Sequence, residues 1–145
     1  MSEEKPISQQ IAELAVNLRY EALPETARKK ATNLLLDLLG SMIGSKEIES
    51  SRIATEVALE LGGPPESTVV GYGTKIAAPN AAFANAIQGY AFDFADDHNE
   101  SNAHPSVATI PVSMALGEML HLGGKEVITA IALGNEVVCR LGSAF

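Results

Sequence analysis

Residues 79–106 read PNAAFANAIQGYAFDFADDHNESNAHPS, an alanine-rich helical pattern that runs into a loop dense in charge. Four carboxylates and two of the chain's three histidines fall between Asp93 and His104. Apolar segments with the spacing of buried helices lie on both sides of this loop. Charged groups at this density are expensive to bury in a core, so the loop is the first candidate for a functional site.

Outward from this loop, apolar residues recur every three or four positions over most of the chain, which predicts helices. The expected helices cover about residues 7–21, 25–43, 53–61, 80–94, 106–120 and 126–141. Pro111 either kinks the fifth of these or moves its start to near Thr109. A β-branched run bounded by Gly71 and Gly73 predicts one short β-hairpin near residues 68–77. The chain is therefore expected to be mainly α, a single multi-helix domain over residues 1–145.

Small residues interrupt two of the predicted helices. Residues 34–44 are apolar nearly all round and are expected to be buried. Gly40 and Gly44 lie one turn apart there, either for the close approach of another helix or, for Gly44, as a C-cap. In the fourth helix a stripe of small side chains ends in a carboxylate and would let a ligand or another backbone come close; it consists of Ala82, Ala86, Gly89 and Asp93.

Composition excludes several classes of function. Acidic residues outnumber basic ones 18 to 10, for a net charge of −8, which argues against nucleic acid and anionic membranes as partners. No apolar run approaches the roughly 18 residues of a membrane span. The single cysteine, Cys139, allows no internal disulfide and no iron–sulfur cluster. No apolar segment follows the acidic N-terminus, so we expect no signal peptide and a cytoplasmic location.

Two residues of the loop are suited to proton chemistry. Asp93 lies between Phe92 and Phe94, and burial among aromatic rings can turn a carboxylate into a general base. The alternative is a helix-end carboxylate that pairs with a cation or an N–H group. His104 precedes Pro105, which favours an extended conformation outside the next helix. A histidine there can act as acid, base or carboxylate-binding cation.

The loop also contains residue types that bind metal ions. Six side chains could supply oxygen or nitrogen ligands: Asp93, Asp96, Asp97, His98, Glu100 and His104. Their spacing matches neither an EF-hand loop nor a zinc signature, so we expect no metal. A metal-binding helical module that uses residues 93–104 remains an alternative. Asp96 and Glu100 are the residues most typical of a solvated acidic loop.

The sequence resembles the MmgE/PrpD family, which includes 2-methylcitrate dehydratase, cis-aconitate decarboxylase and iminodisuccinate epimerase. The motifs that carry the resemblance are residues 80–86, the segment from Ala91 to His98, and His104-Pro105-Ser106 with Pro111 beyond. The resemblance also extends over residues 37–40, the strand with Gly71 and Gly73, and the sixth helix, so it covers nearly the whole chain.

The resemblance implies the N-terminal helical portion of a cofactor-independent homodimeric lyase. The expected chemistry, a dehydration, decarboxylation or epimerisation, takes place alpha to a carboxylate of a small polycarboxylic acid. Asp93 and His104 match residues of the family's active site and are the expected catalytic groups. Asp97, His98 and Ser106 are the expected substrate-binding residues, and no metal or organic cofactor is implied.

Two departures from the family pattern bear on function. The family reads Asp-Asp-Thr where this chain has Ala95-Asp96-Asp97, so Asp97 adds negative charge where an anionic substrate would lie. Family members are also about three times as long, and their further catalytic histidine, lysines and tyrosine, with a second α+β domain, match nothing in these 145 residues. We therefore expect the chain to be inactive alone.

A further alternative is a non-catalytic assembly module that dimerises through Gly40, Gly44 and the sixth helix.

Overall fold

The computed structural model describes residues 5–144 of the chain. It contains helices, one 3₁₀ turn and one two-stranded sheet in this order: α1 (Ile7–Asn17), η1 (Tyr20–Ala22), α2 (Glu25–Gly44), α3 (Glu49–Leu61), β1 (Ser67–Val69), β2 (Thr74–Ile76), α4 (Ala78–Tyr90), α5 (Pro105–Met119) and α6 (Gly124–Gly142). The prediction of a mainly α fold with one short hairpin is confirmed. No helix among the described residues is both long and apolar enough to cross a bilayer.

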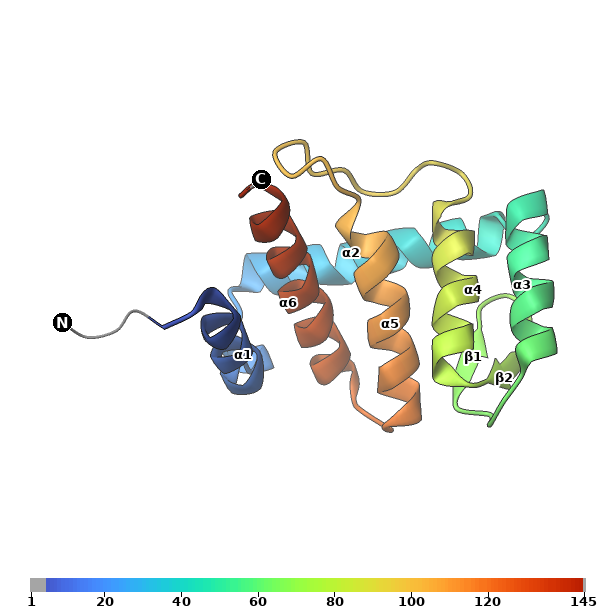
Figure 1. Cartoon of the computed structure of the whole chain (residues 1–145), viewed down its shortest axis with the longest axis horizontal. Helices are drawn as coiled ribbons and strands as arrows, with labels where there is room; N and C mark the ends of the chain where they lie inside the picture. Colours follow the sequence, from blue (N-terminus) through green and yellow to red (C-terminus); the bar gives the residue numbers. More distant parts are fainter. Residues whose placement is uncertain (1–4, 145) are drawn as a thin grey trace.

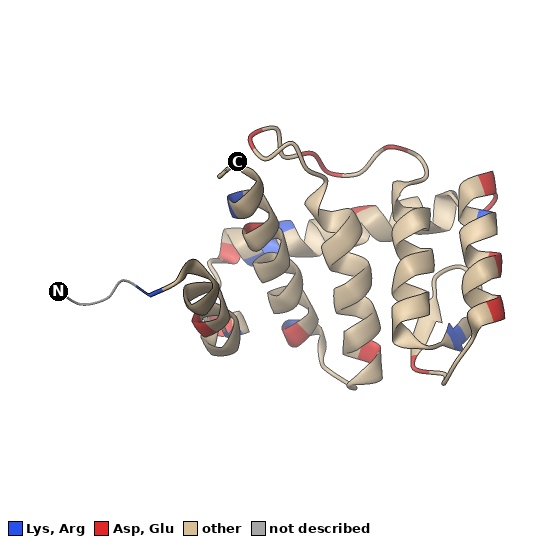
Figure 2. Ribbon diagram, in the orientation of Figure 1, with Lys and Arg blue, Asp and Glu red and all other residues tan. Residues whose placement is uncertain are grey.

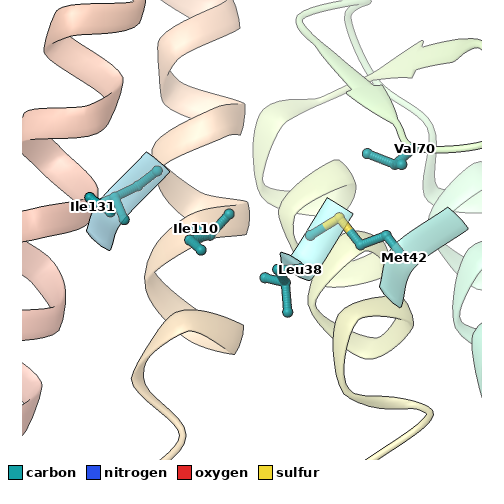
Figure 3. Packing of buried hydrophobic residues seen from close by; sticks show 6 residues of the cluster. Leu38, Met42, Val70, Ile110 and Ile131 are labelled. Atoms are coloured by element: carbon teal, nitrogen blue, oxygen red, sulfur yellow. The ribbon is translucent and has the colours of Figure 1, made fainter. Parts of the chain in front are cut away.

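Helices α3, α4, α5 and α6 lie side by side, and α2 runs across them on one side of this layer (Figure 1). α2 supplies Leu38 and Met42, which are almost fully buried and belong to one core cluster with Ile110 of α5 and Ile131 of α6 (Figure 3). Val70, just after β1, belongs to the same cluster. The main core is therefore the contact between α2 and the layer.

The prediction that residues 34–44 are buried all round is wrong. Leu36 is 71% exposed and Ile43 60% exposed. α2 packs against the layer with one face only, so Leu36 and Ile43 on its other side stay exposed. The apolar pattern of α2 therefore includes an uncovered stripe as well as a buried one.

α4 ends at Tyr90, about four residues before the predicted end. Beyond it the N–H of Asp93 donates to the carbonyl oxygen of Tyr90 at 2.8 Å, and Asp93 has a positive φ of 56°, which ends the helical path. The ring of Phe92 turns back to the end of α2, where a Cβ on Gly44 would lie 2.9 Å from it. Gly44 thus makes room for an aromatic ring and is not a C-cap, which is Ser45.

The small-residue stripe of α4 serves helix packing. A Cβ on Gly89 would lie 2.9 Å from Leu38, and Ala82 is buried. Because Asp93 lies beyond the helix, it does not extend this stripe. Gly89 therefore lets α2 approach α4 closely, whereas Ala82 packs toward Ala115 of α5, and the predicted alignment of Asp93 with these small residues is wrong.

Other helix boundaries also differ from the prediction, including the start of α3, which lies at Glu49. α1 stops at Asn17 because Leu18 is extended, with φ −67° and ψ 133°, and η1 follows separately. α5 begins at Pro105, a favoured first helical position, and continues through Pro111 without a later start.

A carboxylate on α5 holds the hairpin against the layer. Ser67, Thr68 and Val69 pair in antiparallel register with Ile76, Lys75 and Thr74. Glu118 accepts hydrogen bonds from the backbone N–H and the hydroxyl of Thr68 at 3.2 and 2.8 Å, and pairs with the Lys75 ammonium group at 2.8 Å. Glu118 is the only Asp, Glu, Lys or Arg on α4 or α5, so the ribbons of these two helices are otherwise tan in Figure 2.

We expect Leu38→Ala to lower the free energy of unfolding by about 2–5 kcal/mol, because it removes buried methyl groups and leaves a cavity beneath α4. Urea unfolding followed by circular dichroism measures this change. Leu61→Ala on α3 is the matched control, since Leu61 is 65% exposed, and it should change stability by no more than about 0.5 kcal/mol. Equal effects of the two substitutions would contradict the assignment of the core to the α2 interface.

Glu118 predicts a pH dependence of stability. Its partial burial raises the pKa, but the hydrogen bonds from Lys75 and Thr68 and the charge of Lys75 together hold that pKa below the ordinary 4.5. The stabilisation is therefore complete above pH 4.5 and is lost as the pH falls through the lowered pKa of the folded state. We expect Glu118→Gln to weaken the acid-side loss of stability in urea titrations at several pH values. Glu60→Gln, at an exposed position of α3, is the control, and identical pH profiles for Glu118→Gln and wild type would refute this role.

Candidate functional site

The loop of residues 91–104 connects α4 to α5 and extends across the end of the layer toward the C-terminal end of α6 (Figure 1). Its middle part closes on itself, because the N–H of His98 donates to the carbonyl of Ala103 at 3.0 Å. Ser101 packs against the end of α6, where a Cβ on Gly142 would lie 2.6 Å from the Cβ of Ser101. The loop is therefore anchored at both of its ends and at its tip.

Asp93 lies at the start of the loop and is exposed. The burial expected from its two aromatic neighbours is not found, because Phe92 turns toward α2 and Phe94 is 75% exposed. Aspartate tolerates the left-handed conformation better than most residues, which fits the turn after α4. Asp93 is thus a solvent-accessible carboxylate fixed to the end of α4 by its backbone bond to Tyr90.

His104 is half-buried and occupies the N-cap position of α5. Its Nδ1 lies 2.9 Å from the carbonyl oxygen of Asp96. A carbonyl oxygen can only accept, so Nδ1 carries the proton, and in the neutral ring Nε2 keeps its lone pair. Neutral His104 can therefore accept a proton at Nε2, and protonated His104 can donate from that atom to a carboxylate.

Tyr90 connects the two expected catalytic residues. The His104 ring packs against the Tyr90 ring with centroids 5.6 Å apart and an interplanar angle of 57°. Asp93 meets the same residue through its backbone hydrogen bond. The sequence pattern placed Tyr90 only within the predicted helix of residues 80–94. Its position three residues before Asp93, at the end of a helix, is the one local signal that could have singled it out.

Asp97 and His98 border a cavity of about 320 Å³ between α2, the loop and α6. Lys30 of α2 and Asn135 and Cys139 of α6 also line it, whereas Asp93 and His104 do not. The expected substrate-binding residues and the expected catalytic residues therefore do not all surround one cavity.

His98 has the opposite tautomer to His104. The backbone N–H of Ser101 donates to Nδ1 of His98 at 3.3 Å, and the Ser101 hydroxyl lies 2.8 Å from the same nitrogen. Because Nδ1 accepts, the neutral ring carries its proton on Nε2. His98 can therefore donate a hydrogen bond from Nε2, which suits the binding of a carboxylate oxygen.

Ser106 lies inside the contact between α5 and α6 and is 1% exposed. Its hydroxyl accepts a hydrogen bond from the Asn135 amide at 3.1 Å, and Asn135 also accepts one from the Thr109 hydroxyl. Because α5 begins at Pro105, Ser106 lies within its first turn and does not cap the helix. The cap interaction comes from Asp96, whose Oδ1 accepts from the Ser106 N–H at 3.1 Å. Asn135, missed in the sequence, closes this polar contact.

A metal site and a nucleophilic thiol both find little support among the residues near the loop. Within residues 5–144, no group of three or more His, Cys, Asp or Glu side chains is placed to hold a metal ion. Burial raises the pKa of the Cys139 thiol, and the carboxylates of Glu136 and Asp96 raise it further. A thiol in this environment stays protonated near neutral pH and is a poor nucleophile.

Comparison with known families agrees with the motifs of the loop. The family model of the MmgE/PrpD N-terminal domain matches residues 9–145, which includes every expected site residue. A comparison with curated proteins returned no match. Because the family match covers nearly the whole chain, the protein belongs to the MmgE/PrpD family, whose members are dehydratases and other lyases.

Proposed function

We propose that the chain provides Asp93 and His104 to a lyase-type site that acts alpha to a carboxylate of a small polycarboxylic acid. The observation that carries this proposal is the convergence of the two residues on Tyr90, one through a 2.8 Å backbone bond and the other through ring packing. The family match over residues 9–145 supports the class of reaction. Dehydration, decarboxylation and epimerisation all belong to this class.

In a dehydration, Asp93 takes the proton from the carbon alpha to the carboxylate. The electron pair of that C–H bond forms the new double bond, and the hydroxyl group on the neighbouring carbon leaves as water after it accepts a proton from an acid. His104 serves the same site in one of two ways, as the partner acid or as a cation that binds a substrate carboxylate. The exposure of Asp93 supports its part, because substrate can reach the carboxylate.

Asp97, His98 and Ser106 are proposed to contribute to substrate binding. The donor at Nε2 of His98 suits a carboxylate, whereas the negative charge of Asp97 disfavours one beside it. The buried hydroxyl of Ser106 gives that residue an indirect part, through the position of the helix that begins at Pro105. We propose further that the reaction needs no cofactor and takes place in the cytoplasm.

The resemblance implies further catalytic groups and an α+β domain that these 145 residues do not contain. We therefore propose that additional polypeptide completes the site and that the 145-residue chain alone has no turnover. Incubation of the purified chain with 2-methylcitrate or cis-aconitate, followed by chromatography of the products, tests this point. Turnover by the chain alone would contradict the need for a second domain.

We expect Asp93→Asn to lower kcat/KM by about 100-fold or more in the enzyme that carries the second domain, because the amide cannot take the substrate proton. Steady-state kinetics measures this ratio. Glu100→Gln is the matched control, since Glu100 is an exposed carboxylate of the same loop, and its kcat/KM should stay within about 3-fold of wild type. If Asp93→Asn stayed within the range of this control, Asp93 would have no part in the mechanism.

The alternative of an assembly module gains support from one face of α2. Leu36 and Ile43 are exposed, and a Cβ on Gly40, between them, would meet nothing within 4 Å. Positions 36, 40 and 43 lie on one helix face, and a glycine there lets a second helix approach closely. We propose that this face forms the contact of the homodimer, since a two-fold interface presents the same patch on both copies.

Sedimentation velocity of the purified chain should therefore show a dimer, and Leu36→Glu should convert it to a monomer because it places an unpaired charge in the contact. Leu61→Glu is the control, since Leu61 is an exposed leucine on α3, and it should leave the dimer intact. A monomeric wild type, or a Leu36→Glu chain that remains dimeric, would rule out this face of α2.

A further inference from the structure

Asp96 makes two hydrogen bonds that neither the proposed reaction nor the sequence pattern assigns to it. Its backbone carbonyl accepts from Nδ1 of His104 at 2.9 Å, and its side-chain Oδ1 accepts from the backbone N–H of Ser106 at 3.1 Å. The sequence suggested a solvated carboxylate, but Asp96 is half-buried. Asp96 is thus hydrogen-bonded to His104 and to Ser106, the residues on either side of Pro105.

The side-chain bond has a clear physical basis. The first N–H groups of a helix have no partner within the helix, and the helix dipole favours a carboxylate at this end. Pro105 has no N–H, so the N–H of Ser106 is the first donor that α5 offers. Asp96 supplies the acceptor from a segment that lies ten residues away in the sequence.

The two ends of this bridge are themselves held in place. Ser106 is fixed by the bond between its hydroxyl and Asn135 of α6. The loop beyond Asp96 is closed by the bond from the His98 N–H to the Ala103 carbonyl. The carboxylate of Asp96 therefore sets how its own carbonyl lies relative to the start of α5, where His104 stands.

We propose that Asp96 is the positioning residue for His104, because its cap on α5 holds the Asp96 carbonyl against Nδ1 and so keeps the Nε2 lone pair of the neutral ring free. The consequence for catalysis rests on the proposed function, in which His104 acts at the substrate. The placement of the ring by Asp96 does not rest on it. Asp96 itself touches no reacting atom, and it acts only through His104.

The experiment is ¹⁵N NMR of the imidazole rings in the uniformly labelled 145-residue chain. At about pH 8, above the ordinary histidine pKa of about 6.5, the spectrum reports which ring nitrogen carries the proton. We expect Nδ1 to be protonated in His104 and Nε2 in His98, so that His98 serves as an internal reference. A wild-type His104 with its proton on Nε2 would overturn the proposal without any variant.

Asp96→Ala keeps the backbone carbonyl but removes the cap, and we expect His104 to shift toward the Nε2–H tautomer that a free neutral imidazole favours in water. Asp96→Asn keeps an oxygen that can accept from the Ser106 N–H, so it should preserve the wild-type tautomer. Glu100→Ala, in the same loop, is the control that should change nothing. Backbone amide signals of α5 and α6 show whether each variant is folded.

A folded Asp96→Ala chain with the wild-type tautomer would overturn the proposal, and so would an Asp96→Asn chain that loses it. In the enzyme with the second domain, Asp96→Ala should lower kcat/KM by about 10-fold or more, with recovery in Asp96→Asn, because a wrong tautomer disables a catalytic imidazole. If the tautomer changed and kcat/KM did not, the positioning by Asp96 would stand and the proposed role of His104 as the partner acid would fail, because only that role leaves a neutral ring with one tautomer.

Discussion

The packing of α2 across the helical layer is the contact on which the other parts of the fold depend. Ala31, Leu38 and Met42 lie along one face of α2 and share a core with α5 and α6. The absence of a side chain at Gly89 brings α4 into the same contact, because Leu38 occupies the space that a Cβ would need. α2 contacts α4, α5 and α6. It therefore sets the spacing between α4 and α5, the two helices that the charged loop connects.

Hydrogen bonds from polar side chains then fix the relative positions of helices and hairpin that apolar packing alone does not determine. Asn85 of α4 accepts from the Val70 N–H at 2.9 Å and donates to the Thr68 carbonyl at 3.0 Å, so it holds the hairpin where Glu118 holds it from α5. Asn135 does the same between α6 and the start of α5. Hydrogen bonds are directional, and a buried polar group without a partner destabilises the fold. Each such side chain therefore selects one arrangement of the helices among many that bury a similar apolar area. The conformation of the loop of residues 91–104 depends on these contacts.

Much of the fold could be predicted from local patterns. The helices were found because apolar spacing of three to four residues is local, and the hairpin because Gly71 and Gly73 accept the positive φ values of its turn, 78° and 65°. The end of α4 was missed because Phe92 and Asp93 continue the helical pattern, while the fold draws Phe92 to the space beside Gly44. The motif singled out Asp93 and His104 as the expected catalytic residues. It gave no sign of the contacts of Tyr90, Asp96 and Asn135, which depend on other segments.

The sequence by itself determined the helical class, the hairpin, the family and the chemical groups available in the loop, because these follow from residue types and short spacings. Only the tertiary structure decided which face of α2 is buried, which ring nitrogen of His98 and of His104 carries the proton, and which side chain caps α5. Ser106 meets Asn135 from 29 residues away, and Thr68 meets Glu118 from 50. Partners so distant are chosen by how the helices pack together, and neither residue's local sequence records that packing.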